Sequence, residues 1–392
     1  FVDAHLLFTD TLANTETVSI SHEALIRAWE RLHEWVDVRR DDLKLGSRIR
    51  ADANEWNARN RPIDSLYRGE VLQQALADHE RLFGRHHDIT VGSMDQLATL
   101  YVVQSRSNDA ASLLDEVLRI RTASLGPEHV DTLGTMNSLA LLYTETERFE
   151  EAEKLFESAI VIQDRRGGPD HPVTLDLKAN LAWLHYWYAA SIKENSEAYQ
   201  ERLRKARELG EPTLEARIRV LGEDHQATLA SMANLAIVYK ALEMPDRAEE
   251  LQRKDLEISL RMLGESHPDT ITSLANLGNS FRERRRFEEA LPYFERALVN
   301  ARKSNPPDHP GTAFILGWYG SSLRELGRYS DAEPHLIDAR GIIGRVMGES
   351  HAVARQMSRG LAQLYEGWEK TEPGKGYGKK GEEWKGKIEE SK

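Results

Sequence analysis

Apolar residues recur along this chain as pairs of helical stripes. Leu139 and Tyr143 stand four residues apart, and Ala152, Phe156 and Ala159 follow at steps of four and three. Steps of three and four residues mark one face of a helix. A short polar turn separates the two stripes. The pattern therefore predicts two helices joined by a tight turn.

The same pair of stripes returns with a period of 42 residues, and a Leu-Gly-x-x-His linker or a weaker copy of it precedes each pair. Seven histidines keep this register at intervals of 42, 42, 54, 42, 42 and 42 residues: His87, His129, His171, His225, His267, His309 and His351. One interval is 12 residues too long. We therefore expect a tandem array of helix pairs with a 12-residue insertion within residues 171–225.

The linker residues have separate roles in this interpretation. The glycines fall just after an apolar run, where the end of a helix requires a positive φ: Gly126, Gly222, Gly264 and Gly348. Pro268 follows its histidine and suits the first turn of the next helix. Equivalent histidines would be too far apart to share a metal ion, because helices pack about 8–10 Å apart. We expect no metal site, and expect the histidines to tie each linker to its neighbour.

The alternation of small and large residues, together with the recurring linker, resembles the tetratricopeptide repeat in the 42-residue form of kinesin light chains and related bacterial and fungal proteins. The resemblance covers about residues 86–368. It implies an all-α, right-handed solenoid whose first helices line a concave groove that holds a protein or peptide. One departure is Gln252, which stands where Phe156 stands in its own repeat.

Candidate groove residues lie in the middle of the array. Asn180, Asn234 and Asn276 occupy one position in three consecutive repeats, and in the repeats that these resemble such asparagines face the groove. An amide can donate to and accept from a peptide backbone at once. An inter-repeat hydrogen bond would explain the asparagines equally well. Trp183 and Trp187 share a helix face beside the insertion, where they either contact a ligand or pack against the extra residues.

We place the extra residues at the junction of the two helices of that repeat. The first helix would continue for about three more turns, or the segment would fold back as a longer loop. After the last repeat, the stretch 373–381 breaks the helical pattern with Pro373 and four glycines. Glu382 to Glu390 then predicts a short helix that covers the open end of the array.

The amino-terminal part does not fit the repeat. Ala4–Asp10 and Thr17–Ile20 predict two short strands around a polar turn, and a helix opens at Ser21-His22-Glu23. This order resembles the end of the winged-helix region in STAND-class signalling NTPases, over about residues 1–78. The resemblance implies four parts: 1–40 as the end of a winged-helix domain, 41–85 as connecting helices, 86–368 as repeats and 369–392 as a terminal cap.

The same resemblance makes His22 a candidate contact for the phosphate of ATP or ADP in an intact protein. The alternative is that the imidazole caps or packs on its own helix. No Gly-x-x-x-x-Gly-Lys-Ser/Thr occurs in this sequence, so we expect no cofactor and no NTPase activity in these residues alone. We expect no catalytic residues either. The chain begins without Met, in the middle of a pattern, and we interpret it as a piece of a longer protein.

Composition narrows the function classes. A net charge of −12 argues against broad nucleic-acid binding. No run of 18 apolar residues predicts a membrane span, and cysteine is absent. These features fit a cytoplasmic protein without membrane contact.

The sequence thus favours the sensor arm of a STAND-type NTPase, which the resemblance places in immune or antiviral signalling. Such an arm would bind a protein or peptide in the groove and couple it to nucleotide-controlled homo-oligomerisation through an upstream domain. The alternative is a passive adaptor without a nucleotide switch. A winged-helix transcription regulator is a third possibility that the acidic balance disfavours.

Overall fold

The computed structural model describes residues 7–12, 15–20, 69–192 and 196–390. The chain divides into two compact units, residues 1–97 and 98–392. Within the described residues, no helix is long and apolar enough to cross a membrane.

The first unit contains a two-stranded antiparallel hairpin, with β1 at Leu7–Leu12 and β2 at Thr15–Ile20. Its register pairs Leu7 with Ile20 and Leu12 with Thr15. The expected strands overlap these two, but both observed strands extend closer to the turn. Helix α3 spans Gly69–Phe83 and α4 spans Asp88–Val103, with its last residues in the second unit. His22 and the helix expected from Ser21 lie outside the described residues.

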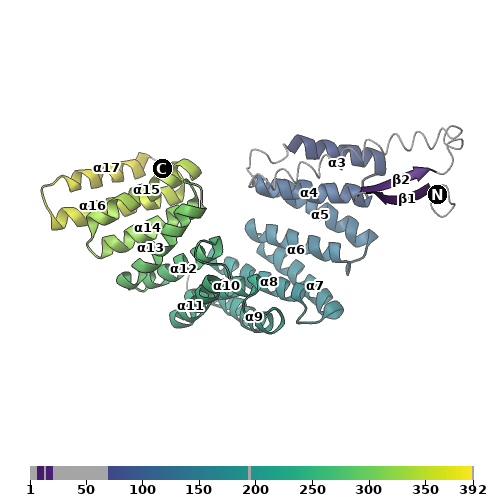
Figure 1. The fold of residues 1–392 in the computed structure, drawn as a ribbon, viewed down its shortest axis with the longest axis horizontal. Helices are drawn as coiled ribbons and strands as arrows, with labels where there is room; N and C mark the ends of the chain where they lie inside the picture. The colour runs from purple at the N-terminus through teal and green to yellow at the C-terminus, as the bar shows by residue number, and fades with distance from the viewer. Residues whose placement is uncertain (1–6, 13–14, 21–68, 193–195, 391–392) are drawn as a thin grey trace. The chain divides into compact units, whose positions relative to one another are not determined.

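The second unit is a run of helices in pairs (Figure 1). In each pair the first helix begins directly after one of the register histidines. The first helices are α6 Val130–Glu145, α8 Pro172–Ser191, α10 Gln226–Ala241, α12 Pro268–Glu283, α14 Pro310–Glu325 and α16 Ala352–Thr371. The second helices are α5 Ser107–Ser124, α7 Phe149–Gly167, α9 Glu197–Leu221, α11 Pro245–Met262, α13 Phe287–Ser304, α15 Tyr329–Met347 and α17 Tyr377–Glu390.

Most of the linkers between pairs share one construction. Gly126 has φ +90° and Gly264 has φ +79°, which confirms the positive φ expected at these helix ends from the sequence. Thr132 donates its hydroxyl to the carbonyl of Gly126 at 2.9 Å, and thereby satisfies a group exposed by the turn. In the one linker without a glycine there, Asn305 ends α13 with φ −98°.

The register histidines cap the helices that follow them. Nδ1 of each one accepts a hydrogen bond from the backbone N–H two residues later, over 3.2 Å at both His129 and His267. The same bond occurs at His87, His171, His225, His309 and His351. Each imidazole therefore accepts a hydrogen bond from a backbone N–H in the first turn of the following helix, which has no partner within the helix itself. The expectation that these side chains tie neighbouring linkers together was wrong.

Small residues set how closely the paired helices approach. Ala140 and Ala152 are fully buried with Phe156 in one repeat. In another, a Cβ at Gly278 would come within 2.9 Å of the ring of Phe294. This contact confirms the steric reason inferred from the sequence, because a methyl group there would force the helices apart.

The core changes character at α11. Leu256 belongs to a buried apolar cluster that continues through the repeats to Trp368, whereas Ile258 belongs to another that extends back to α9. The same helix also buries two polar residues, Gln252 and Asp255. Oε1 of Gln252 has no hydrogen-bond partner among the described residues. The substitution of Gln252 for a core aromatic therefore marks a polar interruption of the core.

The insertion lengthens both helices of its repeat. Helix α8 has 20 residues and α9 has 25, whereas α6 has 16 and α7 has 19. The extension of α8 is about one turn rather than three. The expectation of a much longer first helix was therefore wrong, because α9 takes up a larger share of the extra residues.

The last helix packs on α16. The ring of Tyr377 stacks on Trp368 with centroids 4.0 Å apart, and Gly381 is buried beside Tyr365. Helix α17 begins at Tyr377, within the stretch expected to break the pattern, because the break is confined to Gly374 and Gly376 with their positive φ angles. This helix covers the apolar face that α16 would otherwise expose.

Candidate functional site

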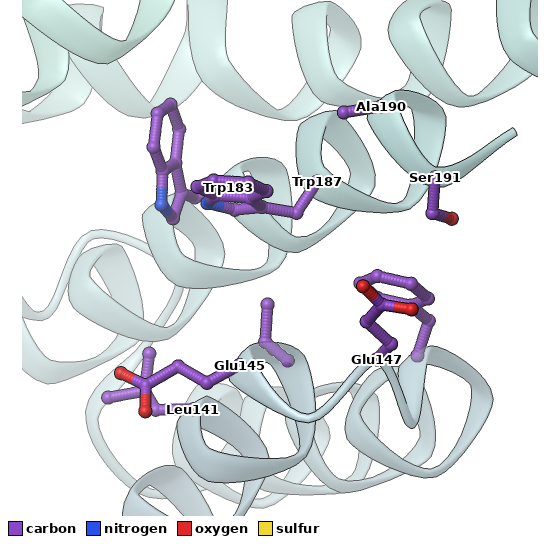
Figure 2. Close-up of a pocket in the computed structure, with 9 residues that line it drawn as sticks. Leu141, Glu145, Glu147, Trp183, Trp187, Ala190 and Ser191 are labelled. Atoms are coloured by element: carbon purple, nitrogen blue, oxygen red, sulfur yellow. The ribbon is translucent and has the colours of Figure 1, made fainter. Parts of the chain in front are cut away.

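A cavity of about 500 Å³ opens between α6 and α8 (Figure 2). Two of the residues expected to line the groove, Trp183 and Trp187, form one wall of it. The facing wall comes from the end of α6 and the turn before α7. The complete lining is Leu141, Thr144, Glu145, Glu147, Phe149, Trp183, Trp187, Ala190 and Ser191.

The two indoles form a corner of the cavity. Their ring centroids are 6.0 Å apart and their planes meet at 87°. Trp183 also stacks on Tyr186, with ring centroids 4.9 Å apart, and this contact fixes the orientation of the Trp183 indole. Trp187 leaves 48% of its surface exposed, and Figure 2 shows both indoles facing the space above α6. The site therefore presents two aromatic surfaces at right angles.

The extra turn of α8 completes this wall. Ala190 and Ser191 lie in the four residues by which α8, with 20 residues, exceeds its neighbours α6 and α10, with 16 each. Tyr188 anchors the turn by stacking on Phe149, with centroids 4.7 Å apart. The guanidinium of Arg202 lies 4.0 Å from the ring of Tyr188. Tyr188 thus packs against Phe149 and Arg202, whereas Trp183 and Trp187 border the cavity.

The three candidate asparagines occupy different environments. Asn180 donates to Oδ1 of Asn137 on α6 at 2.9 Å, which is the inter-repeat hydrogen bond considered above. Asn234 and Trp183 line a small second cavity of about 20 Å³ between α8, α9 and α10. Asn276 is half-buried on α12 and lines neither cavity. The structure thus brings together Trp183 and Trp187, with Asn234 close behind, and leaves Asn276 apart.

Sequence reasoning missed the α6 side of the cavity. Leu141 is 37% exposed, although it lies in an apolar stretch that suggested burial. It stands at the position of Trp183 in the preceding repeat, two residues after the leucine of the core pattern. A comparison of exposed positions between consecutive repeats would have paired these two residues.

Sequence comparison agrees with this architecture. A model described as "Tetratricopeptide repeat" matches residues 91–164, 131–194, 195–261 and 248–303, more than half of the 392 residues in total. The chain belongs to the tetratricopeptide repeat family. Residues 1–64, ahead of the repeats, match the model of "Novel STAND NTPase 1". A search of curated proteins finds no match.

Solved structures share the repeat fold. A STAND protein with a tetratricopeptide repeat sensor from Pyrococcus horikoshii is 15% identical and has a TM-score of 0.57, over 82% of this chain but 44% of its own length. The apo form of the quorum sensor NprR from B. thuringiensis is 14% identical with a TM-score of 0.53, over 93% of this chain and 99% of its own. BtubC from P. vanneervenii is 22% identical, with a TM-score of 0.50 and coverages of 62% and 92%.

Proposed function

We propose that this chain is the sensor arm of a STAND-type signalling NTPase, in which the repeats hold a protein or peptide ligand. The observation that carries the proposal is the order of the two matches: a STAND model at residues 1–64 followed by a repeat array from residue 91. The fold shared with a STAND protein that has a repeat sensor supports the same arrangement.

The cavity between α6 and α8 is the proposed point of ligand contact. The first helices of successive repeats touch one another, α6 with α8 and α8 with α10, so their outer residues form a continuous face. Trp183 and Trp187 lie on this face beside open space. A ligand that binds here in one state of the protein more tightly than in another would shift the balance between resting and oligomeric, active forms. Immune or antiviral signalling is the role that the STAND likeness suggests.

The nucleotide switch has a direct test. The full-length natural protein is purified and denatured, and any released nucleotide is identified by chromatography. Stoichiometric ADP or ATP supports the switch, with His22 as a candidate phosphate contact. A full-length protein that carries no nucleotide and binds none when titrated with ATP or ADP would instead be a passive repeat adaptor.

Ligand contact is tested on the repeats themselves. A random dodecapeptide library is selected against the chain, and a labelled selected peptide is titrated by fluorescence anisotropy. We expect the double variant Trp183→Ala, Asn234→Ala to bind this peptide at least tenfold more weakly. Its thermal melt checks that the fold persists. Unchanged binding by the folded variant would show that the ligand contacts a different face.

A further inference from the structure

We propose that the cavity between α6 and α8 binds a basic side chain, lysine or arginine, of an extended peptide. This inference rests on the proposed peptide-binding function and specifies the chemistry of the ligand. The observation behind it is the combination of two tryptophans with two carboxylates, Glu145 and Glu147, that line the same cavity and have no cation partner among the described residues.

Two carboxylates face the indoles. Glu145 ends α6 and Glu147 lies in the turn after it, and both line the cavity with Trp187. Figure 2 shows these carboxylates on the side opposite Trp183 and Trp187. Both glutamates are exposed. Among the described residues, neither side chain forms an ion pair or a hydrogen bond.

Equivalent glutamates elsewhere in the array do have cations. Glu283 and Glu325 stand at the position of Glu145, 16 residues after their own capping histidines. Glu283 pairs with Lys240 of the preceding repeat at 2.5 Å, and Glu325 pairs with its neighbour Arg324 at 2.6 Å. Both of the other repeats that carry a glutamate at this position thus place a cation beside it.

The cations are missing at the cavity because of two substitutions. Thr144 stands where Arg282 and Arg324 stand in later repeats. Val102 holds the corresponding position in the preceding repeat, where Lys240 stands relative to Glu283. Glu145 consequently keeps its negative charge without an internal partner, and a ligand cation can take the place that lysine or arginine fills elsewhere.

The aromatic corner suits the same ligand. A guanidinium or ammonium group is attracted to the face of an indole, and tryptophan is the strongest aromatic partner for a cation. Trp183 and Trp187 both border this space, and Trp187 is 48% exposed, so its indole is open to a cation. Leu141 supplies apolar surface for the methylene groups of a lysine or arginine side chain. The chain's net charge of −12 would also draw a basic segment towards it at low salt.

The experiment extends the library selection described above. Peptides selected on the full chain are sequenced, and we expect lysine and arginine to be enriched over the input library. A labelled selected peptide is then compared with copies in which each basic residue in turn is replaced by norleucine. We expect one replacement to weaken binding by about tenfold, equivalent to about 1.4 kcal/mol.

Variants locate this effect in the cavity. Glu145→Gln with Glu147→Gln should bind the selected peptide about tenfold more weakly, and should no longer distinguish it from the norleucine copy. Glu283→Gln removes one charge, from the position in a later repeat that Glu145 holds in its own, and should leave the affinity unchanged. Trp187→Phe should retain more affinity than Trp187→Ala, because phenylalanine keeps an aromatic face.

The outcomes separate this inference from the proposed function. Selected peptides without basic enrichment, or a norleucine copy that binds as well as its parent, would overturn the basic ligand but leave peptide binding intact. A loss in Glu283→Gln as large, for each charge removed, as the loss in the double variant Glu145→Gln, Glu147→Gln would mean that only the overall charge matters, and would also overturn it. A library that yields no binder would overturn peptide binding itself.

Discussion

The guanidinium of Arg202 lies 3.2 Å from Nδ1 of His185, and the same Nη1 atom donates to Glu153 at 2.8 Å. The imidazole is 3% exposed. Burial lowers the pKa of His185 to about 4, the charge of Arg202 adds to this effect, and Glu153 opposes it. The extended hairpin of α8 and α9 is therefore locked to α7 through a neutral, buried histidine.

This histidine makes stability depend on pH. Between about pH 6.5 and about pH 4 the unfolded chain binds a proton at His185 that the folded chain does not. Stability is therefore fully present above about pH 6.5, falls as the pH drops towards 4, and loses no more from this group below that. The loss should be about 3 kcal/mol at most. Urea denaturation across this range measures it. His185→Gln, which keeps an acceptor for Arg202 but does not titrate, should show a smaller loss, and an identical pH profile would refute this role.

Asp255 should make the stability of the fold depend on pH in the opposite direction. It is 6% exposed at a position that holds alanine in other repeats, as at Ala159 and Ala297. Burial raises its pKa to about 6, whereas a hydrogen bond from Ser273 partly lowers it. The folded chain thus binds a proton more tightly than the unfolded chain, and stability is lost as the pH rises from about 3.8 through 6.

Asp255→Ala should therefore stabilise the array at neutral pH, by about 3 kcal/mol. At pH 4.5 the gain should be about 2 kcal/mol smaller, because most folded chains then hold the carboxyl in its neutral form. Urea denaturation of both proteins at pH 4.5 and 7.5 measures the difference. A substitution that destabilises at both values would mean that the carboxyl group makes contacts worth more than its desolvation costs.

Gly264→Ala tests the requirement for a positive φ directly after α11. The glycine has φ +79°, and a Cβ added there would meet no atom within 4 Å, so the substitution should cost about 1 kcal/mol through the backbone alone. Gly134→Ala is the matched control. Gly134 also has open space around it but lies inside α6, and alanine there should stabilise by up to about 1 kcal/mol. Thermal melts that shift in the same direction would contradict this assignment.

Loss of a capping histidine should weaken the first turn of the helix that follows it. His267→Ala removes the acceptor for the amide of Asp269 and should cost about 1 kcal/mol, whereas His267→Asn supplies another acceptor and should retain the cap. Hydrogen exchange resolved to the first turn of α12 measures this locally. Faster exchange is expected in the alanine variant alone. Equal protection in all three proteins would show that the imidazole is dispensable there.

The sequence was a reliable guide wherever the repeat itself determines the structure. The spacing of the histidines, the small residue at Gly278 and the glycine at Gly264 each have a local physical cause that recurs every 42 residues. The capping role of the histidines was missed because histidine is not among the usual helix-capping residues. Nothing in the pattern of apolar residues indicates that Nδ1 replaces a hydroxyl or carboxylate.

Where the repeat changes, the sequence was a weaker guide. The insertion could be located but its length could not be divided between α8 and α9, because both segments have helical composition. Trp183 and Trp187 were identified as groove candidates from aromatic clustering, and both border the cavity. The role of Glu145 could not be inferred from its own repeat, because its significance lies in the ion pairs of Glu283 and Glu325 elsewhere.

The extra turn of α8 has a consequence for how such a gene can change. Each ordinary 42-residue unit starts with its own histidine cap, and all of them except the unit that ends at Asn305 finish with a glycine. Recombination at the linkers could therefore delete or duplicate a unit and leave closed helices on both sides. The unit from His171 to His225 is different, because Ala190 and Ser191 supply a wall that ordinary units lack. The preceding unit, from His129 to His171, supplies the facing wall through Leu141, Glu145 and Glu147. The other units could be gained or lost, but exchange of either of these two would erase the cavity. The number of repeats can thus change in evolution, whereas the two adjoining units that form the cavity have to be kept together.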